Sequence, residues 1–445
     1  MLIRWRRVKL PLFCPPHVRF EDQIMMFRGD NRCCRLKSGI GCVRKSIYFL
    51  CFSSIFGTIL YYYLVERSVD YGNLDNSVYI SLIWKWDSSQ SPVNKLAEPL
   101  HTREHANYLV VYDYIAADKF YLGNSSVTLT TQGTYEFLHH VEQLCLRWKA
   151  PASIAVYAPG RDFYPAVRRI LYLRRCRHPC LKANVTWHLI VDKAHAPTRE
   201  DTLKAREMPV NCQNDTFNFI NFRETHKLSY PINLARNVAR KMARTHYVLA
   251  SDIELYPSLD LVPRFLDMVL EHNVSSLRVY VLPVFEVEEN SKVPDTKKEL
   301  LEMMSSKKAV FFHKLVCDAC HKFPDRDRWL KTAPPEDSMT IFSTVKHAPP
   351  WEPFYIGTNN EPPFHENFTW EGKMNKFPQV LEMCFMDYDF CILDNAFLVH
   401  SPGIKRIDRA SERRRAPYAV NNTKLYRLLR RDLTRKYRPR FNCMK

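Results

Sequence analysis

The central part of the sequence, residues 46–402, has little net charge. The sequence also lacks a second CxxC pair. The 445 residues carry a formal charge of +18, but residues 1–45 contribute +8 and residues 403–445 contribute +12, which leaves −2 for the rest. A nucleic-acid-binding body is therefore disfavoured. Cys317 and Cys320 precede His321, yet no second CxxC or matched His pair occurs after them at zinc-finger spacing. We expect a disulfide or another structural role for this pair instead of a zinc site.

A long uncharged run near the N-terminus predicts a membrane anchor. Ser46–Val65 contains 20 residues without a charge, and a helix of that length crosses a hydrocarbon layer of roughly 30 Å. The basic excess before it predicts a cytosolic tail over 1–45 and translocation of the chain beyond residue 65. A cleaved signal peptide is the alternative. We expect a stem over 66–105 and a lumenal body over 106–445, which is long enough for one large domain.

Sequons and cysteines agree with a lumenal body. Six N-x-[ST] sequons begin after the anchor, at Asn124, Asn184, Asn214, Asn273, Asn367 and Asn421. Nine of the 14 cysteines also lie after it. In an oxidising compartment most of these nine should form disulfides, and an odd number leaves one free or paired between chains.

Strand and helix patterns alternate from residue 126 onward. We expect strands at Ser126–Gly133, Ser153–Pro159 and Val185–Asp192, and helices over 135–148, 163–175 and 233–244. Repeated strand–helix–strand units predict an α/β fold with a mainly parallel sheet between layers of helices. No internal repeat of fixed period is visible.

Two acids come directly after an apolar strand in "YVLASDIELYPS". Tyr247–Ala250 suits a buried strand, and Asp252 and Glu254 lie just beyond it. Ligands of α/β sheets lie beyond the carboxyl ends of the strands, and the spacing of two aims both side chains to one side. Two close carboxylates repel unless they share a cation. The pair therefore predicts a site for Mn²⁺ or Mg²⁺, which also binds phosphates, with a solvated surface turn as the alternative.

Several pieces of the chain, in order, resemble glycosyltransferase family 49. They are "SVTLTTQGTYEFLHHVEQLCLRWKAPASIAVYAPG", "NLARNVARKMARTHYVLASDIELYPS", "WEPFYIG", the "LE" of "QVLEMC", "NAFLVH" and "TKLYRLLRRDLTRKY". The resemblance covers about three quarters of the chain. It implies a GT-A fold, which is Rossmann-like and binds nucleotide sugars, a single-pass type II topology in the Golgi membrane, and a UDP-sugar donor held through a divalent cation.

The resemblance also implies an activity. We expect inverting transfer of glucuronic acid from UDP-glucuronate to a glycoprotein glycan of the O-mannosyl, matriglycan type. An N-acetylglucosaminyl- or xylosyltransferase on the same scaffold is the enzymatic alternative, because a few pocket residues decide the donor. A glycan-binding member without turnover is the other alternative. The sequence leaves the oligomeric state open.

Metal ligands are implied by the matched positions, and donor contacts are predicted from the place of residues in the fold. Asp252 and Glu254 occupy the acidic metal-binding position, with Glu where the common pattern has Asp, and His400 occupies the position of the metal-binding histidine. Donor contacts are expected from Thr130, Thr131 and Gln132 at the end of the first strand, and from Arg236 and Asn237, for which a solvated helix face is the alternative. A donor carboxylate requires an extra cation, which Lys376 or Arg236 would supply.

An inverting mechanism requires a general base for the acceptor hydroxyl. Glu382, in the matched "LE", is the candidate, and Asp387, Asp389 and Glu366 are its competitors.

Two further segments concern the acceptor and the surface. Trp351 and Glu352 are expected to form an acceptor platform, and Trp351 equally suits core packing. Asn422–Tyr437 predicts an amphipathic helix packed on the body. Its basic face is either solvated, as is usual, or contacts a membrane surface or an acidic glycan.

Overall fold

The computed structural model describes residues 100–213, 221–271, 277–335, 337–347, 350–400, 403–437, 440 and 443. They belong to one compact unit, Glu98–Lys445. The tail, the predicted anchor Ser46–Val65 and most of the predicted stem lie outside the described residues. No helix among the described residues is long and apolar enough to span a bilayer.

A ten-stranded sheet forms the centre of the unit, in the order β1-β2-β5-β4-β3-β6-β12-β8-β13-β11. Its strands are β1 (His101–His105), β2 (Tyr108–Ile115), β3 (Gly123–Gly133), β4 (Ala152–Tyr157), β5 (Val185–Asp192), β6 (Thr245–Ala250), β8 (Arg278–Leu282), β11 (Thr340–Lys346), β12 (Phe354–Gly357) and β13 (Asp389–Asp394). The predicted strands Ser126–Gly133, Ser153–Pro159 and Val185–Asp192 are confirmed as β3, β4 and β5, and the predicted strand Tyr247–Ala250 is confirmed as β6. β1 occupies the last five residues of the range expected as a stem, so the folded body begins earlier than predicted.

The sheet is mixed, which corrects the prediction of a mainly parallel one. β5, β4, β3 and β6 are parallel, as are β8 and β13. The other neighbours, including both pairs made by β12, are antiparallel. The strands that the sequence revealed all lie in the parallel block, because strands buried on both faces read as continuous apolar runs.

A second sheet brings distant parts of the chain together. It has the order β10-β9-β14-β7, with β7 (Leu255–Pro257), β9 (Val284–Val287), β10 (Ala309–Phe311) and β14 (Leu398–His400). In this sheet His400 is the register partner of Leu255 on one side and of Glu286 on the other. The segment just after Glu254 therefore lies directly beside His400.

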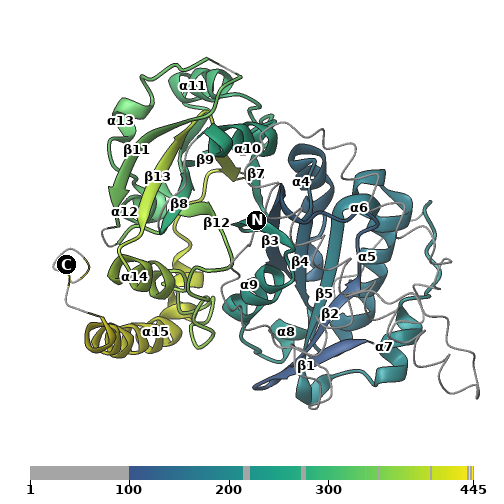
Figure 1. Ribbon diagram of the computed structural model, residues 1–445. Helices are drawn as coiled ribbons and strands as arrows, with labels where there is room; N and C mark the ends of the chain where they lie inside the picture. The colour runs from purple at the N-terminus through teal and green to yellow at the C-terminus, as the bar shows by residue number, and fades with distance from the viewer. Residues whose placement is uncertain are drawn as a thin grey trace, which may run out of the picture. The chain divides into compact units, whose positions relative to one another are not determined.

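Helices cover both faces of the large sheet (Figure 1). They are η2 (Tyr135–Phe137), α4 (His140–Trp148), η3 (Gly160–Asp162), α5 (Phe163–Cys176), α6 (Pro179–Asn184), η4 (Lys193–His195), α7 (Arg199–Ala205), α8 (Phe222–Thr225), α9 (Ile232–Lys241), α10 (Leu261–Glu271), α11 (Lys297–Ser305), α12 (Lys314–His321), α13 (Arg326–Trp329), α14 (Phe377–Phe385) and α15 (Arg409–Lys436). The predicted helices are confirmed as α4 with the preceding η2, α5, α9 and α15, the last of which is longer than expected. Along β4, Ile154 packs in the core with α4 and α5, whereas Ala155 faces α9, as alternation along a strand requires.

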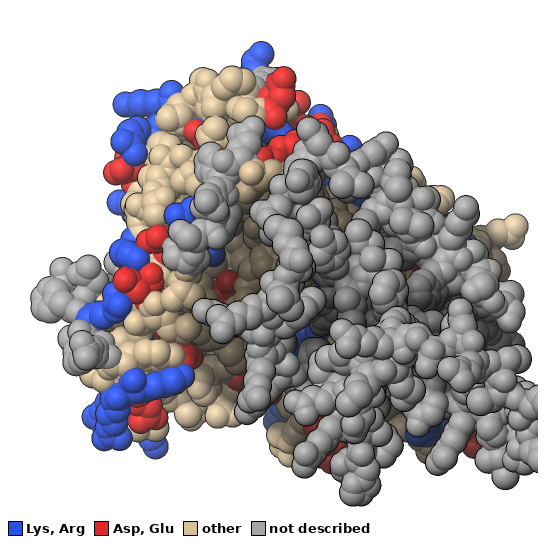
Figure 2. Space-filling model, viewed as in Figure 1, with Lys and Arg blue, Asp and Glu red and all other residues tan. Residues whose placement is uncertain are grey.

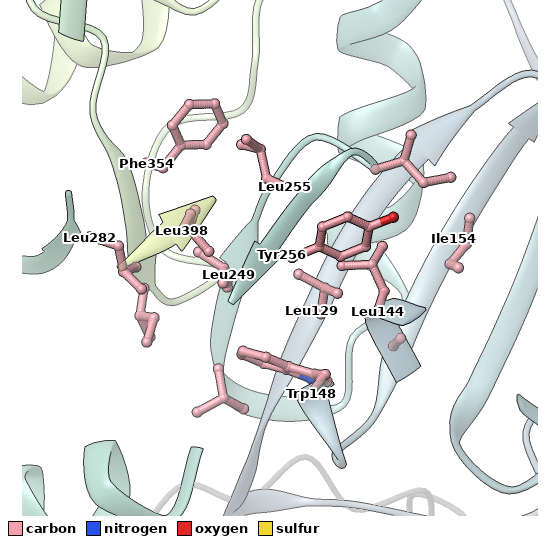
Figure 3. Packing of buried hydrophobic residues seen from close by; sticks show 14 of the residues in the cluster. Leu129, Leu144, Trp148, Ile154, Leu249, Leu255, Tyr256, Leu282, Phe354 and Leu398 are labelled. Carbon is pink, nitrogen blue, oxygen red and sulfur yellow. The ribbon is translucent and has the colours of Figure 1, made fainter. Parts of the chain in front are cut away.

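One core joins the two sheets. Leu129 of β3 packs in it with Leu144 and Trp148 of α4, and Leu255 and Leu398 of the small sheet belong to the same cluster (Figure 3). Burial of each such side chain contributes about 1.5–3 kcal/mol. The ends of β6 and β14, where the candidate site residues lie, are therefore fixed by packing.

Among the described residues, four disulfides confirm the expectation from the cysteine count. They are Cys145–Cys180, Cys176–Cys212, Cys317–Cys320 and Cys384–Cys443. Cys391 is buried and free. The CxxC pair is thus a disulfide, as the absence of further zinc ligands predicted.

The described sequon residues differ in accessibility. Asn124, Asn367 and Asn421 are exposed, whereas Asn184 is buried and its Oδ1 accepts a hydrogen bond of 3.0 Å from the Tyr121 hydroxyl. Asn214 and Asn273 lie outside the described residues. In the folded protein Asn184 is therefore not open to glycosylation.

Candidate active site

A cavity of about 1440 Å³ opens beside the carboxyl ends of β3, β6 and β14. Gln132 at the end of β3 lines it, as do Asp252 and Glu254 after β6 and His400 at the end of β14. This is where an α/β sheet binds its ligand. The fold thus brings the three predicted metal-binding residues to the wall of one cavity.

Asp252 is held by a buried arginine. Its Oδ1 accepts a hydrogen bond of 2.9 Å from Nη2 of Arg236, whose Nη1 donates to Oδ1 of Asn375 at 2.6 Å. Burial by itself would raise the pKa of Asp252, but the charges of Arg236 and Lys376 and the Arg236 hydrogen bond hold it well below its usual range. Asp252 therefore remains ionised in the cavity, and Arg236 from α9 is fixed at its edge.

Glu254 contacts two groups from the C-terminal part of the chain. Its Oε1 lies 3.1 Å from Nε2 of His400 and accepts a hydrogen bond of 2.8 Å from Nζ of Lys405. Desolvation opposes the charge, but the contacts with His400 and Lys405 lower the pKa of Glu254 to about 2. Sequence reasoning missed Lys405, because its own segment carries no sign that it will meet Glu254.

Glu286 lies behind the histidine. It is the register partner of His400 on β9. Among the described residues, Oε1 of Glu286 and Nδ1 of His400 are both buried without a hydrogen-bond partner. A carboxylate bonded to the second ring nitrogen of a ligating histidine commonly fixes its tautomer, but no hydrogen bond joins these two atoms.

Two of the three predicted metal ligands fit a divalent cation. The 3.1 Å between Oε1 of Glu254 and Nε2 of His400 matches adjacent ligands of an octahedral ion with bonds of about 2.1 Å. Each acid also pairs with a cation of the chain, Asp252 with Arg236 and Glu254 with Lys405. Within the described part of the chain no group of three or more His, Cys, Asp or Glu residues gathers as a metal site. Glu254 and His400 are therefore placed as two adjacent ligands of a cation, and Asp252 is not yet placed as the third.

A second charged pair lies in the same cavity. Nζ of Lys376 is 3.8 Å from Oε2 of Glu352 and 3.6 Å from the centre of the Phe354 ring. Both charged side chains are mostly buried. Burial lowers the pKa of Lys376 and raises the pKa of Glu352. The cavity wall thus offers a desolvated cation beside a carboxylate with increased affinity for a proton.

The predicted donor-binding residues divide into two groups. Gln132, Arg236 and Lys376 line the cavity. Thr130 and Thr131 are buried and are not among its lining residues.

Asn237 does not line the cavity either. Its Nδ2 donates to the carbonyl of Phe364 at 2.8 Å and to Oε1 of Glu366 at 2.9 Å. The two threonines and Asn237 are thus corrected from donor contacts to structural residues, because their side chains are buried or bonded elsewhere.

The position of Glu382 contradicts its assignment as the base. It lies on the face of α14 that packs against α15, and its Oε1 accepts hydrogen bonds from Nζ of Lys436 at 2.8 Å and from the Tyr437 hydroxyl at 3.0 Å. Glu382 is therefore a tie between two helices. The competitors Glu366, Asp387 and Asp389 do not line the cavity either.

Trp351 packs in the core, which was the alternative for it. It is 5% exposed, its ring is stacked on His347 with centroids 6.1 Å apart, and it does not line the cavity. The acceptor platform predicted from it is thus corrected. Glu352, the next residue, does line the cavity, because its side chain points to the opposite side of the extended segment.

A mixed α/β body with acids after a central strand and a charged cavity at the strand ends is consistent with a GT-A glycosyltransferase. A family model described as "Glycosyl-transferase for dystroglycan" matches residues 126–438. The chain belongs to this family, glycosyltransferase family 49, and is a glycosyltransferase. Membership implies a UDP-sugar donor and a glycan acceptor.

Curated relatives fall into two groups. The chain is 30% identical over 322 residues to "Beta-1,4-glucuronyltransferase 1" of Danio rerio, which covers 70% of this chain and 74% of that protein. It is 28% identical over 323 residues to the Homo sapiens protein of the same name, covering 70% and 76%. It is also 26% identical over 349 residues to "Xylosyl- and glucuronyltransferase LARGE2s" of Gallus gallus, covering 76% of this chain and 40% of that protein.

Proposed function

We propose that the protein transfers glucuronic acid from UDP-glucuronate to a glycan of a glycoprotein, with inversion at the anomeric carbon. The observation that carries this proposal is the desolvated Lys376 in the wall of a cavity that also holds Asp252 and Glu254. Nζ of Lys376 is 3.8 Å from the carboxylate of Glu352, which is too far for a hydrogen bond. This buried cation can therefore pair with a donor sugar that bears a carboxylate. The names of the relatives support the same donor.

The donor diphosphate requires positive charge as its bond to the sugar breaks. Mn²⁺ or Mg²⁺, held by Glu254 and His400 with Asp252 as a further ligand, would stabilise the charge that develops on the phosphate oxygens. Arg236 and Lys405 contribute fixed charges to the same wall, each now paired with one of the two acids. Such preorganised charges cost no reorganisation during the reaction.

Glu352 is the carboxylate that we assign as general base. The acceptor hydroxyl oxygen forms the new bond to the anomeric carbon, the bond from that carbon to the phosphate oxygen breaks, and UDP leaves with the electron pair. The hydroxyl proton passes to Glu352. Burial favours this role, because a raised pKa strengthens the carboxylate as a proton acceptor.

The xylosyltransferase alternative is retained for one reason. One group of relatives carries both xylosyl and glucuronyl activities in its name. Lys376 distinguishes the two donors, since UDP-xylose has no carboxylate to pair with it.

The cellular location is proposed from the sequence. The uncharged run Ser46–Val65 after a basic tail suits a type II anchor in the Golgi membrane. The four disulfides fit an oxidising lumen.

A panel of UDP-sugars tests the proposed function. The full-length protein with Mn²⁺ should hydrolyse or transfer from UDP-glucuronate in preference to UDP-xylose and UDP-N-acetylglucosamine. Equal inactivity with every donor would support a glycan-binding protein without turnover.

In the variant Asp252→Asn, which keeps the size of the side chain, both activity and Mn²⁺ binding measured by electron paramagnetic resonance should fall. Unchanged Mn²⁺ affinity would remove Asp252 from the metal site.

A further inference from the structure

The outer face of α15 carries unpaired positive charge. Between Arg409 and Lys436 the helix has ten Lys and Arg residues and two acids. One acid, Glu412, pairs with Lys373, and the other, Asp432, lies 3.7 Å from Arg435. In the part of the chain that the structure describes, no ion pair joins the exposed cations Arg413, Lys424, Arg427, Arg430 and Arg431 to an acid.

These cations form one stripe that points away from the body. At about 100° per residue, Lys424, Arg427, Arg430 and Arg431 fall within an arc of about 120°. The opposite face holds Leu433, which packs with α14 in a small apolar cluster. Figure 2 shows blue side chains gathered where Figure 1 places α15.

The beginning of α15 reaches the cavity. Ser411, Glu412 and Arg415 in its first two turns line the cavity. Arg415 donates to the carbonyl of Trp370 at 2.6 Å, and Asn422 donates to the carbonyl of Lys373 at 2.7 Å. The helix is thus fixed to the turn that precedes Lys376, and its stripe leads from the rim of the active site.

We propose that this stripe binds an anionic stretch of the acceptor glycan outside the active site. This inference rests on the proposed function, because it requires an acceptor whose end enters the cavity. From Arg413 to Arg431 these cations span about 27 Å at 1.5 Å per residue, which is the length of several sugar units. Carboxylate, phosphate or sulfate groups along a glycan would pair with the Arg and Lys side chains.

A membrane surface is the weaker partner for this helix. Helices that lie on membranes insert an apolar face between the lipids. The apolar face of α15 already packs against α14, through Leu433 and its neighbours. The residues that remain outside are mainly charged, with Val420 and Leu428 as exposed apolar side chains among them, and a mainly charged surface complements a soluble polyanion.

The direct test compares two triple variants of the full-length protein in neutral detergent. The stripe variant is R427E/R430E/R431E. The control is R103E/K119E/R199E, which changes the charge equally at three exposed residues on β1, between β2 and β3, and at the start of α7, none of which lines the cavity. The probe is a fluorescent heparin octasaccharide, and a neutral dextran of similar length reports nonionic binding.

The stripe variant should bind the heparin probe at least about tenfold more weakly, since each exposed charge pair contributes a factor of a few and three are reversed. The control should change by less than about twofold. Binding to the unsubstituted protein should weaken as salt rises. Equal binding by the two variants, or equal binding of dextran and heparin by the unsubstituted protein, would overturn the proposal.

Two more measurements separate this proposal from its rivals. If only binding to vesicles with anionic lipid depends on the stripe, the surface contacts membranes and the glycan proposal is wrong. Hydrolysis of UDP-glucuronate without acceptor should be the same in the stripe variant and the unsubstituted protein. If that hydrolysis is absent from the unsubstituted protein while heparin binding persists, the proposed function has failed and the anion-binding surface has not. Loss of the thermal unfolding transition is not expected, because the three arginines are exposed, and the single variant Arg427→Gln repeats the test with less perturbation.

Discussion

Glu352 lies in the cavity and Glu382 lies between two helices, so we expect the same substitution, Glu to Gln, to have different effects on kcat at the two positions. Glu352→Gln removes a cavity carboxylate whose pKa is raised by burial, and loss of a general base lowers kcat by about 10²- to 10⁴-fold. Glu382→Gln removes a charge that pairs with Lys436, whose side chain is 62% exposed. Such a pair contributes less than about 1 kcal/mol. We therefore expect kcat close to unchanged and a loss in Tm of at most about 3 °C for this variant.

The pH profile of kcat/KM makes this comparison sharper. A base must be ionised to act, so activity should fall as the pH drops through the raised pKa of Glu352, above the range of an ordinary glutamate. The Glu382→Gln variant should keep that acid limb, and Glu352→Gln should lose it together with most of its activity. If Glu382→Gln proved inactive at an unchanged Tm while Glu352→Gln remained active, the assignment of both residues would be refuted.

Further expectations concern donor choice, a disulfide and acid stability. Lys376→Met should lower kcat/KM for UDP-glucuronate by about tenfold or more relative to UDP-xylose, since a hydrogen bond between charged groups contributes about 1.5–3 kcal/mol. An equal loss with both donors would contradict the role of Lys376 in donor choice. The Cys384–Cys443 disulfide closes a loop of 59 residues, so its removal by Cys443→Ala should destabilise the protein by up to about 4 kcal/mol in urea unfolding. An unchanged midpoint would show that the tie contributes nothing. Burial lowers the pKa of His347 to about 4. This pKa lies below the value of 6.5 in the unfolded chain, so protonation of His347 favours unfolding. The free energy of unfolding should therefore be highest above about pH 6.5 and should fall by about 3 kcal/mol as the pH drops to about 4. Thermal scans across this pH range should show a smaller fall in Tm for His347→Gln than for the unsubstituted protein. Parallel plots of Tm against pH for the two proteins would argue against the lowered pKa of His347.

Local sequence patterns were enough to predict the parallel block and part of the site. β3, β4 and β5 were visible as apolar, β-branched runs, and Asp252 and Glu254 were marked by their position after such a run. The flanking antiparallel strands were not predicted, because the orientation of a strand depends on which neighbour it pairs with and not on its own residues.

The errors in the site have a common cause. The prediction for Glu382 rested on its place in a matched motif, and the prediction for Trp351 rested on the stacking of sugars on aromatic rings. Neither argument contains the partners that the fold supplies, Lys436 and His347. Lys405 was missed because nothing in its own segment shows that it will meet Glu254, which lies 151 residues earlier. The partner of a charge is chosen by packing.

The sequence by itself determined the buried strands of the parallel block, that two acids would come after one of them, that most of the later cysteines would pair, and to which family the chain is related. These properties arise from the chemistry and order of neighbouring residues. The tertiary structure decided which acids face the cavity, which lysines and arginines neutralise them, and which face of α15 remains outside. Those outcomes depend on contacts between residues far apart in the chain, because a side chain is desolvated or paired only when the whole fold brings its neighbours to it.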